Sequence, residues 1–207
     1  MKVDFIAANG NLFSRTIIDL LLFWILVIKK ILLRKIVFMN ELNKELKNQA
    51  RHLGLCDEWT NLWNKDWSNE KMVERMYKGL DFCLKHHWPS NDFIVKHFDQ
   101  EFRRNSNVFV DDKYSINNPK ESLILGKSDI TARFNGANNG TIHIRDNSSV
   151  KLSAKNRSFV IVHLYENAYI DAEQFDRSIV VLIKHSEKVT IIADKAIRIR
   201  EEYDYLK

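Results

Sequence analysis

The sequence predicts an α+β fold, in which a small all-α N-terminal domain is followed by a parallel β-solenoid of about 20 residues per coil. Three observations lead to this expectation. Apolar residues recur every three or four positions between residues 40 and 105. From residue 107 onward, short β-branched runs alternate with Asn, Asp, Ser and Gly. The second region also resembles itself at a fixed offset equal to one such coil.

The composition is that of a folded chain whose charge is unevenly distributed. The 207 residues are 45% hydrophobic and 29% charged and include two cysteines. These values exclude a wholly disordered chain and a disulfide scaffold. Of the net charge of +5, residues 1–39 carry +4, residues 40–105 carry none and residues 106–207 carry +1. Nucleic-acid binding needs a sustained basic face, so we do not expect a nucleic-acid partner.

Residues 1–39 form a hydrophobic, basic leader. Its longest apolar run, Leu20–Ile28, is shorter than a bilayer-spanning helix. Two explanations stay open. The leader is a membrane anchor whose positive charges place the main body in the cytoplasm, or it is a mis-assigned start upstream of a true start at Met39. No small-residue cleavage site follows the run, which argues against a secretory signal. We expect a cytoplasmic protein, associated with the membrane only if residues 1–39 are retained.

The helical domain, residues 40–105, is predicted to contain four short helices. Asn40, Ser68 and Ser90 are candidate N-caps, and Gly54 is a candidate stop. The expected helices cover residues 40–53, 57–65, 68–86 and 91–104. A second feature of this domain is a set of tryptophans spaced at intervals of four. These tryptophans either belong to the core or form an aromatic surface able to stack on bases or sugars, and they are Trp59, Trp63 and Trp67.

The repeat region, residues 107–207, is predicted to be the solenoid. Asn156–Val162 aligns with Asp176–Leu182 at an offset of 20, so that turn residues meet turn residues and apolar positions meet apolar positions. Such a unit cannot bury its apolar face alone, whereas a stack of roughly five coils can. Because side chains alternate along a strand, we expect His143 and His163 to point outward. The same alternation places four apolar residues inside, namely Ile142, Ile144, Val162 and Leu164.

Two groups of polar residues are the candidates for chemistry. The first is a surface ladder of His143 and His163, with Tyr165 and His185 nearby; it is either an acid–base or metal site or an exposed ladder without chemistry. The second is a set of acids that would suit a glycosidase or lyase, although three of the four lie in or beside turns. These acids are Glu166, Asp171, Glu173 and Asp176. We predict no catalytic residue, no metal ligand and no cofactor.

Several turn–strand units resemble the repeats of a known group of proteins. Asp146–Val150, Glu166–Ile170 and Asp176–Ile179 resemble the degenerate D-N-A-x-V repeats of small bacterial and phage-associated β-solenoid proteins. The stretch from Gly79 to Phe93 resembles the N-terminal module of small proteins from bacterial mobile elements. In rung length the region is also similar to bactofilins, which polymerise end to end. The preceding helical domain and the charged tail depart from bactofilins, and the resemblance implies no catalytic residue.

These features together predict a non-enzymatic interaction or structural protein. In this interpretation the helical domain caps the first coil, and the solenoid is a rigid platform for an unknown protein partner. One alternative is a bactofilin-like, membrane-associated protein that forms oligomers or end-to-end polymers. A second alternative is a carbohydrate-active β-helix enzyme. Oligomeric state separates the first alternative from the platform, and loss of activity on changing the acids separates the second.

Overall fold

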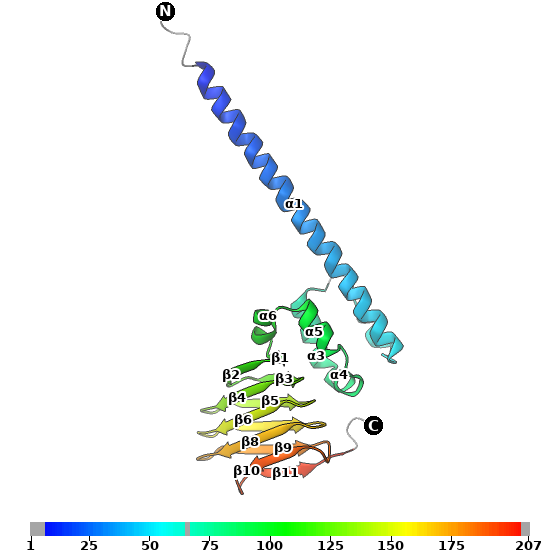
Figure 1. The fold of residues 1–207 in the computed structure, drawn as a ribbon, viewed down its shortest axis with the longest axis vertical. Coiled ribbons are helices and arrows are strands. Elements are labelled where there is room, and N and C mark those ends of the chain that lie inside the picture. The colour runs from blue at the N-terminus through cyan, green and yellow to red at the C-terminus, as the bar shows by residue number, and fades with distance from the viewer. Residues whose placement is uncertain (1–6, 65–66, 204–207) are drawn as a thin grey trace, which may run out of the picture. The chain divides into compact units, whose positions relative to one another are not determined.

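The computed structural model describes residues 7–64 and 67–203, and the side chains from residue 19 onward (Figure 1). The first six residues of the predicted leader, position 65 of the predicted second helix and the last four residues of the predicted solenoid lie outside the described residues. The chain divides into two compact units, residues 1–72 and residues 73–207.

The first unit is built on α1, a 46-residue helix from Ala7 to His52. At 1.5 Å per residue its length is about 69 Å. The prediction that a helix begins at Asn40 is wrong, because α1 is already helical there. Neither Gly nor Pro occurs between residues 11 and 53, so nothing in the sequence interrupts the helix. Gly54, with a φ of +90°, follows the end of α1, as predicted.

The C-terminal part of α1 carries the packed face of this unit. Leu42, Leu46 and Ala50, spaced one helical turn apart, are buried on one side of the helix. The unit also contains α2 (Asp57–Leu62) and the beginning of α3 (Asn69–Lys78). Within the described part of the chain, no helix combines the length and the apolar character needed to cross a membrane.

The second unit begins with short helices that include α4 (Leu80–His86), α5 (Asn91–His97) and α6 (Gln100–Asn105). Two predicted helices are each broken in two. Gly79 separates α3 from α4, and a break at Phe98 and Asp99 separates α5 from α6. The Asp99 side chain accepts a hydrogen bond from Phe102 N at 2.8 Å and so starts a new helix. Ser90 caps α5 as predicted, at 3.2 Å from Phe93 N.

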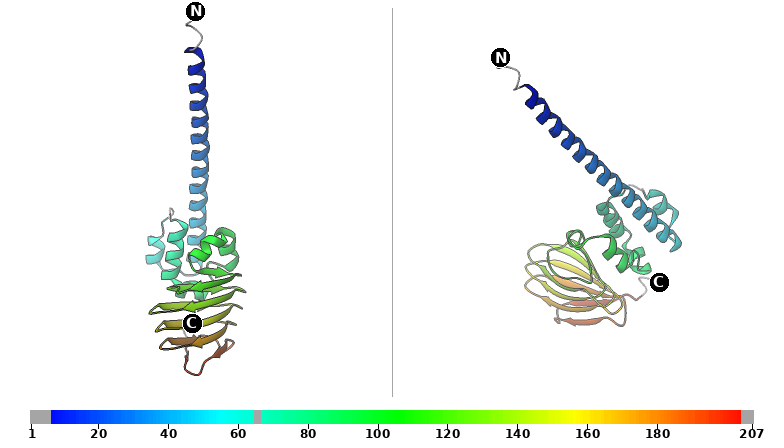
Figure 2. Two further views of the ribbon diagram at one scale, coloured as in Figure 1. Left: turned by 90° about the vertical axis from the view of Figure 1, so that its left-hand side faces the viewer. Right: turned by 45° about the horizontal axis from the view of Figure 1, so that its top comes forward.

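In the part of the chain that the structure describes, eleven strands follow, and they form two parallel sheets (Figures 1 and 2). The odd-strand sheet has the order β1-β3-β5-β7-β9-β11, and the even-strand sheet has the order β10-β8-β6-β4-β2. Each coil contributes one strand to each sheet. The strands are β1 (Val108–Val110), β2 (Lys113–Asn117), β3 (Glu121–Leu125), β4 (Asp129–Phe134), β5 (Asn139–Ile144), β6 (Ser149–Ala154), β7 (Phe159–Leu164), β8 (Tyr169–Gln174), β9 (Ile179–Lys184), β10 (Thr190–Ala193) and β11 (Arg198–Glu201).

The strand register confirms the predicted coil length. Ile142 lies beside Val162, and Val162 lies beside Leu182. The period shortens in the first coil, where Val108 lies beside Leu123, and changes again in the last, where Leu182 lies beside Ile199. The regular solenoid therefore has about four coils, somewhat fewer than the five expected, because the terminal coils depart from the repeat.

The solenoid core is the space between the two sheets. The four residues predicted to face inward, Ile142, Ile144, Val162 and Leu164, are fully buried there. Large and small side chains complement each other across this space. A Cβ atom on Gly140 would collide with the Phe134 ring and with the Pro119 carbonyl, whereas the following coils carry Val160 and Val180 at the same position. Gly140 is therefore required so that Phe134 fits into the core.

The two ends of the solenoid differ. At the first coil, Arg103 donates to the carbonyls of Phe98 and Val110 and ties α6 to β1. Arg104 binds Asp112 through two hydrogen bonds of 2.7 and 2.8 Å. The Arg104 hydrogen bond and charge lower the pKa of Asp112. At the last coil, every residue of β11 is exposed.

Candidate functional site

The outer face of the odd-strand sheet brings together the four residues of the predicted ladder, which we call the ring cluster. Val162 and Leu164 point into the core, so their neighbours His163 and Tyr165 point outward by the alternation of a strand. His143 is the register partner of His163 in the adjacent strand. His185 directly follows β9. The members of the ring cluster are His143, His163, Tyr165 and His185.

The rings of the cluster are nearly parallel. His143 and His163 have centroids 4.8 Å apart and planes 9° apart, which is the spacing of adjacent strands. Tyr165 and His185 stack at 4.5 Å with planes 9° apart. His163 and His185 are instead joined in their common plane, because His163 Nδ1 lies 3.0 Å from His185 Nε2. The register pairs His163 with Ile183, so this contact runs diagonally across the sheet.

The hydrogen bonds define one arrangement of protons in this pair. His185 Nδ1 lies 2.8 Å from the carbonyl oxygen of Glu202, which can only accept. His185 therefore donates from Nδ1 and, as a neutral ring, accepts at Nε2. His163 must then donate from Nδ1. Burial lowers the pKa of His163 to about 4, and the neighbouring histidines add to the effect. Burial also lowers the pKa of His185, so both rings are neutral near pH 7.

The residues of the predicted ladder are less exposed to solvent than the sequence led us to expect. His143 and His163 point outward as expected, but His143 is 6% exposed and Tyr165 is 2% exposed. Among the described residues, His143 Nδ1 is buried without a hydrogen-bond partner. His143 Nε2 lies 3.7 Å from Glu121 Oε1. His143 and Tyr165 are too deeply covered to belong to a surface ladder, whereas His163 and His185 are half-buried.

The acids proposed for a glycosidase do not share a site. Glu166 lies in the turn after β7, whereas Asp171 and Glu173 belong to β8 in the other sheet. Asp171 lies beside Lys151 on the outer face of the even-strand sheet. Asp176, with a φ of +57°, occupies the opposite turn of the coil. A pair of carboxyl groups for glycoside cleavage must flank one bond, and these four residues are distributed over three different surfaces.

A second cluster was missed by the sequence analysis and contains His87, Asp146 and Glu166. His87 Nε2 lies 2.8 Å from Glu166 Oε1. His87 Nδ1 lies 3.9 Å from Asp146 Oδ1. One ligand atom from each residue lies within 4.8 Å of the others, a spacing that suits a metal ion. Asp146 and Glu166 occupy equal positions in successive coils, which the repeat could have revealed. His87 follows α4, and no sequence signal connects it to them.

Asp146 already has partners within the protein. Its Oδ2 accepts from Gly126 N and from Asn91 Nδ2, and its Oδ1 accepts from Arg145 Nε at 3.1 Å. Burial opposes ionisation of this carboxyl group, but these contacts nevertheless lower the pKa of Asp146. The carboxylate thus holds the turn of one coil against the helical segment, and this accounts for its position without a metal.

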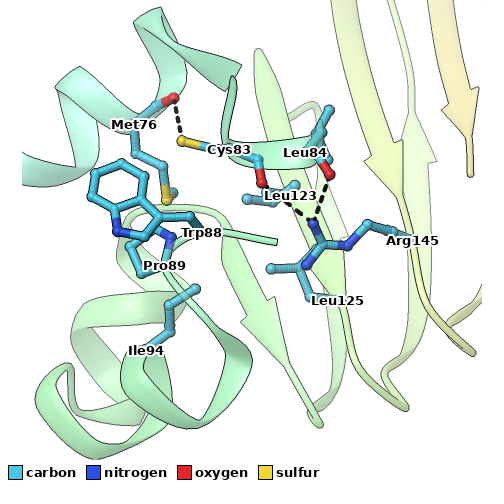
Figure 3. Close-up of a pocket in the computed structure, with 9 residues that line it drawn as sticks. All are labelled: Met76, Cys83, Leu84, Trp88, Pro89, Ile94, Leu123, Leu125 and Arg145. Carbon is cyan, nitrogen blue, oxygen red and sulfur yellow. Dashed lines mark hydrogen bonds between the residues drawn. The ribbon is translucent and has the colours of Figure 1, made fainter. Parts of the chain in front are cut away.

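A small cavity lies between the short helices and the odd-strand sheet (Figure 3). Arg145, 3% exposed, lies on its strand side and donates from Nη1 to the carbonyls of Cys83 and Leu84 at 3.5 and 3.3 Å. The cavity has room for about one water molecule. Burial raises the pKa of the Cys83 thiol to about 12, so this thiol is not a nucleophile. The cavity is therefore a small space left where the helices pack on the sheet. Its lining consists of Met76, Cys83, Leu84, Trp88, Pro89, Ile94, Leu123, Leu125 and Arg145.

The predicted aromatic surface lies in the first unit. Trp63 and Trp67 stack with centroids 5.0 Å apart and planes 24° apart. Trp67 is buried, whereas Trp59 and Trp63 are half-buried. Asn43, which the sequence analysis missed, is fully buried; it accepts from Trp63 Nε1 at 3.3 Å and donates to the Trp67 carbonyl at 2.9 Å. These contacts assign Trp63 and Trp67 to packing against α1.

Comparisons with protein-family models, curated proteins and solved structures find no match to this chain. The resemblances to phage-associated solenoid proteins and to bactofilins therefore stay predictions.

Proposed function

We propose that the chain is a non-enzymatic interaction protein in which the solenoid is a rigid platform and the outer face of the odd-strand sheet binds a protein partner. One observation carries this proposal. The strands β7 and β9, Phe-Val-Ile-Val-His-Leu and Ile-Val-Val-Leu-Ile-Lys, are apolar on both faces. Strands with this pattern are normally covered on both sides.

The two outer faces differ in a way that supports this choice. On the even-strand sheet the outward column of Thr131, Lys151 and Asp171 is polar, which suits contact with water, and it becomes apolar only in the last strand, at Ile192. On the odd-strand sheet, Phe159 and Ile179 are adjacent and are 37% and 43% exposed. We call these two residues, with the half-buried Ile161 beside them, the apolar patch.

At another point along the solenoid, the outer face of the odd-strand sheet already packs against helices of the same chain. Leu123 and Leu125, on β3, are buried against the short helices (Figure 3). The apolar patch continues this face onto β7 and β9. Partner surfaces typically combine an apolar centre with a polar rim, and the patch has Asn139 and Thr141 at its margin. A protein partner is therefore a better match than a small polar molecule.

Site-specific photo-crosslinking tests the platform. A benzoylphenylalanine replaces Phe159 in the full chain, expressed in its native host, and the matched control carries it at Tyr169 on the outer face of the even-strand sheet. We expect a discrete adduct from position 159 and none from position 169, and Ile179→Glu should abolish the adduct. Equal labelling at both positions, or none at position 159, would contradict the proposal.

A second candidate function, end-to-end self-association, rests on the last coil. No residue of β10 or β11 is fully buried, and Ile192 and Ile199 are more than half exposed. Unpaired edges with exposed apolar residues template strand addition. The first coil is tied to α6, so this observation favours a tail-to-tail dimer over the polymer that the bactofilin resemblance implies.

Light scattering tests this second candidate. Thr190 N donates to the carbonyl of Ala168, just before β8, and Asp194 N donates to the carbonyl of Ala172 in β8. The N–H groups of successive residues point to opposite sides of a strand, so the N–H of Ala193 points to the free edge. Ala193→Pro removes that donor without disturbing the β8 pairing. We expect a dimer for the unchanged chain and a monomer for the variant. A chain that is monomeric before substitution would rule out the dimer.

A further inference from the structure

Among the residues whose side chains the structure describes, the most exposed large apolar side chains gather on α1. Fourteen large apolar side chains between Leu20 and Phe38 are each at least 48% exposed. We call residues 20–38 the apolar segment. Patches of this extent on soluble proteins mark a binding surface. The segment is separate from the packed face of α1, which begins at Leu42.

The first half of the apolar segment, from Leu20 to Ile28, has no polar face. Successive residues of a helix are about 100° apart, so the nine apolar residues from Leu20 to Ile28 cover its whole circumference. A single protein partner would cover one side and leave the other side in water. An acyl-chain environment covers all sides at once.

The positive charge of the apolar segment favours an anionic bilayer over an uncharged one. Between Asp19 and Glu41 the chain has four basic residues and no acid. Lys29 and Lys30 follow the apolar run directly, and Arg34 lies about one helical turn further on. From these positions they can reach phosphate groups while their stems stay in the apolar layer. Pairing with a second copy of the segment would instead bring like charges together.

We infer that the apolar segment binds the surface of an anionic phospholipid bilayer, with this part of α1 inserted into one leaflet. The uninterrupted run from Leu20 to Ile28 has a length of about 13 Å, whereas the hydrocarbon core is about 30 Å thick. This length suits insertion into one leaflet, with the lysines at the headgroups. The inference does not depend on the platform proposed for the solenoid.

Vesicle co-sedimentation of the full chain tests the inference. The vesicles are phosphatidylcholine alone or phosphatidylcholine mixed with phosphatidylglycerol. The variant Lys29→Gln/Lys30→Gln/Arg34→Gln removes three charges, and Lys127→Gln/Lys151→Gln/Lys188→Gln removes three from the solenoid as a matched control. We expect the unchanged chain to prefer anionic vesicles and the α1 variant to bind at least tenfold more weakly, because each basic residue near the surface contributes to affinity. The control should bind within twofold of the unchanged chain.

Tryptophan fluorescence identifies the segment that inserts. Trp24 lies within the apolar run and is 55% exposed. Its emission should shift to the blue when anionic vesicles are added, and Trp24→Phe should lose this shift while binding equally well. Circular dichroism confirms that each variant keeps its fold. Absence of binding to either vesicle, or a blue shift that depends on protein concentration without lipid, would overturn the inference, and the latter result would indicate a second copy as the occupant.

Discussion

At the scale of single residues, side chains at equivalent positions of the repeat differ in what they contribute to the stability of the fold. Ser158 and Ser178 occupy the same turn position in successive coils, and both are buried. The Ser178 hydroxyl donates to the carbonyl of Phe175 or of Ala154, at 2.7 and 2.9 Å. Among the described residues, the Ser158 hydroxyl has no hydrogen-bond partner. A buried hydroxyl without a partner opposes folding, whereas a paired one favours it.

We therefore expect opposite results from the same substitution at these two serines. Ser178→Ala should lower the free energy of unfolding by about 1 kcal/mol. Ser158→Ala should leave it unchanged or raise it, because the alanine removes an unsatisfied polar atom. Urea denaturation followed by circular dichroism measures both values. Equal losses for the two variants would show that Ser158 has a partner in solution.

The ring cluster predicts a pH dependence. The unfolded chain binds a proton at His163 near pH 6.5, whereas the folded chain binds it only near pH 4, where the pKa of His163 lies. Between these values the unfolded state holds more protons, so stability falls as the pH falls from 6.5 to 4. With allowance for the partial exposure of the ring, the loss is about 1–2 kcal/mol.

A comparison with His163→Phe isolates this contribution. The variant keeps an aromatic ring but has no titrating group, so carboxyl groups elsewhere affect both proteins alike. The stability difference between the unchanged chain and His163→Phe should change across this pH window and stay constant above pH 7. Urea midpoints at a series of pH values measure it, and a flat difference would show that His163 is freely hydrated.

At the scale of elements, the coil is the unit of the solenoid. The β6 and β8 strands are paired one coil apart in the sequence, so Lys151 lies beside Asp171 and Leu152 beside Ala172. Removing one whole coil within a strand therefore keeps every later side chain on its own face. A deletion that is shorter by a single residue turns each of them to the other face.

Deletion of one coil tests this description. Deleting residues 152–171 joins Lys151 to Ala172, and we expect a shorter solenoid that unfolds cooperatively at a lower urea concentration. Deleting residues 152–170 instead would place Asp171 and Glu173 in the core. This second protein should lose its strand signal in circular dichroism. Equal folding of the two deletion proteins would contradict the register.

The elements were predictable to different degrees. The coil period and the inward columns follow from local side-chain alternation, and both are confirmed. The break between α5 and α6 was missed, although Asp99 is a good N-cap, because the apolar spacing of Phe93, Phe98 and Phe102 continues through it. The start at Asn40 was wrong because a good cap residue does not end a helix whose preceding residues also favour helix.

At the scale of the whole molecule, the short helices are part of the solenoid's fold. Tyr77 bonds to the Asn107 carbonyl at 2.9 Å, and Arg145 bonds to the carbonyls at the end of α4. Burial raises the pKa of Tyr77, so its hydroxyl stays protonated. Without the helices, Val110, Leu123 and Leu125 would lose contacts that bury them.

Two fragments test this dependence. Residues 68–207 retain α3 to α6, and we expect a soluble fragment with cooperative unfolding. Residues 107–207 retain only the strands, and we expect that fragment to aggregate because the outer face of β3 becomes exposed. Size-exclusion chromatography separates the outcomes. A monomeric, folded 107–207 fragment would show that the solenoid is independent of the helices.

Local sequence patterns specify the period of the coil, the inward-facing columns and the positions of most turns. These features depend on alternation and turn preference, which are local properties of the chain. Which outward residues are covered, and which polar groups meet, became visible only in the folded arrangement. His163 meets His185 at an offset of 22 rather than 20, and His87 meets Glu166 across 79 positions. Such contacts depend on how distant elements pack together, and no local pattern encodes that packing.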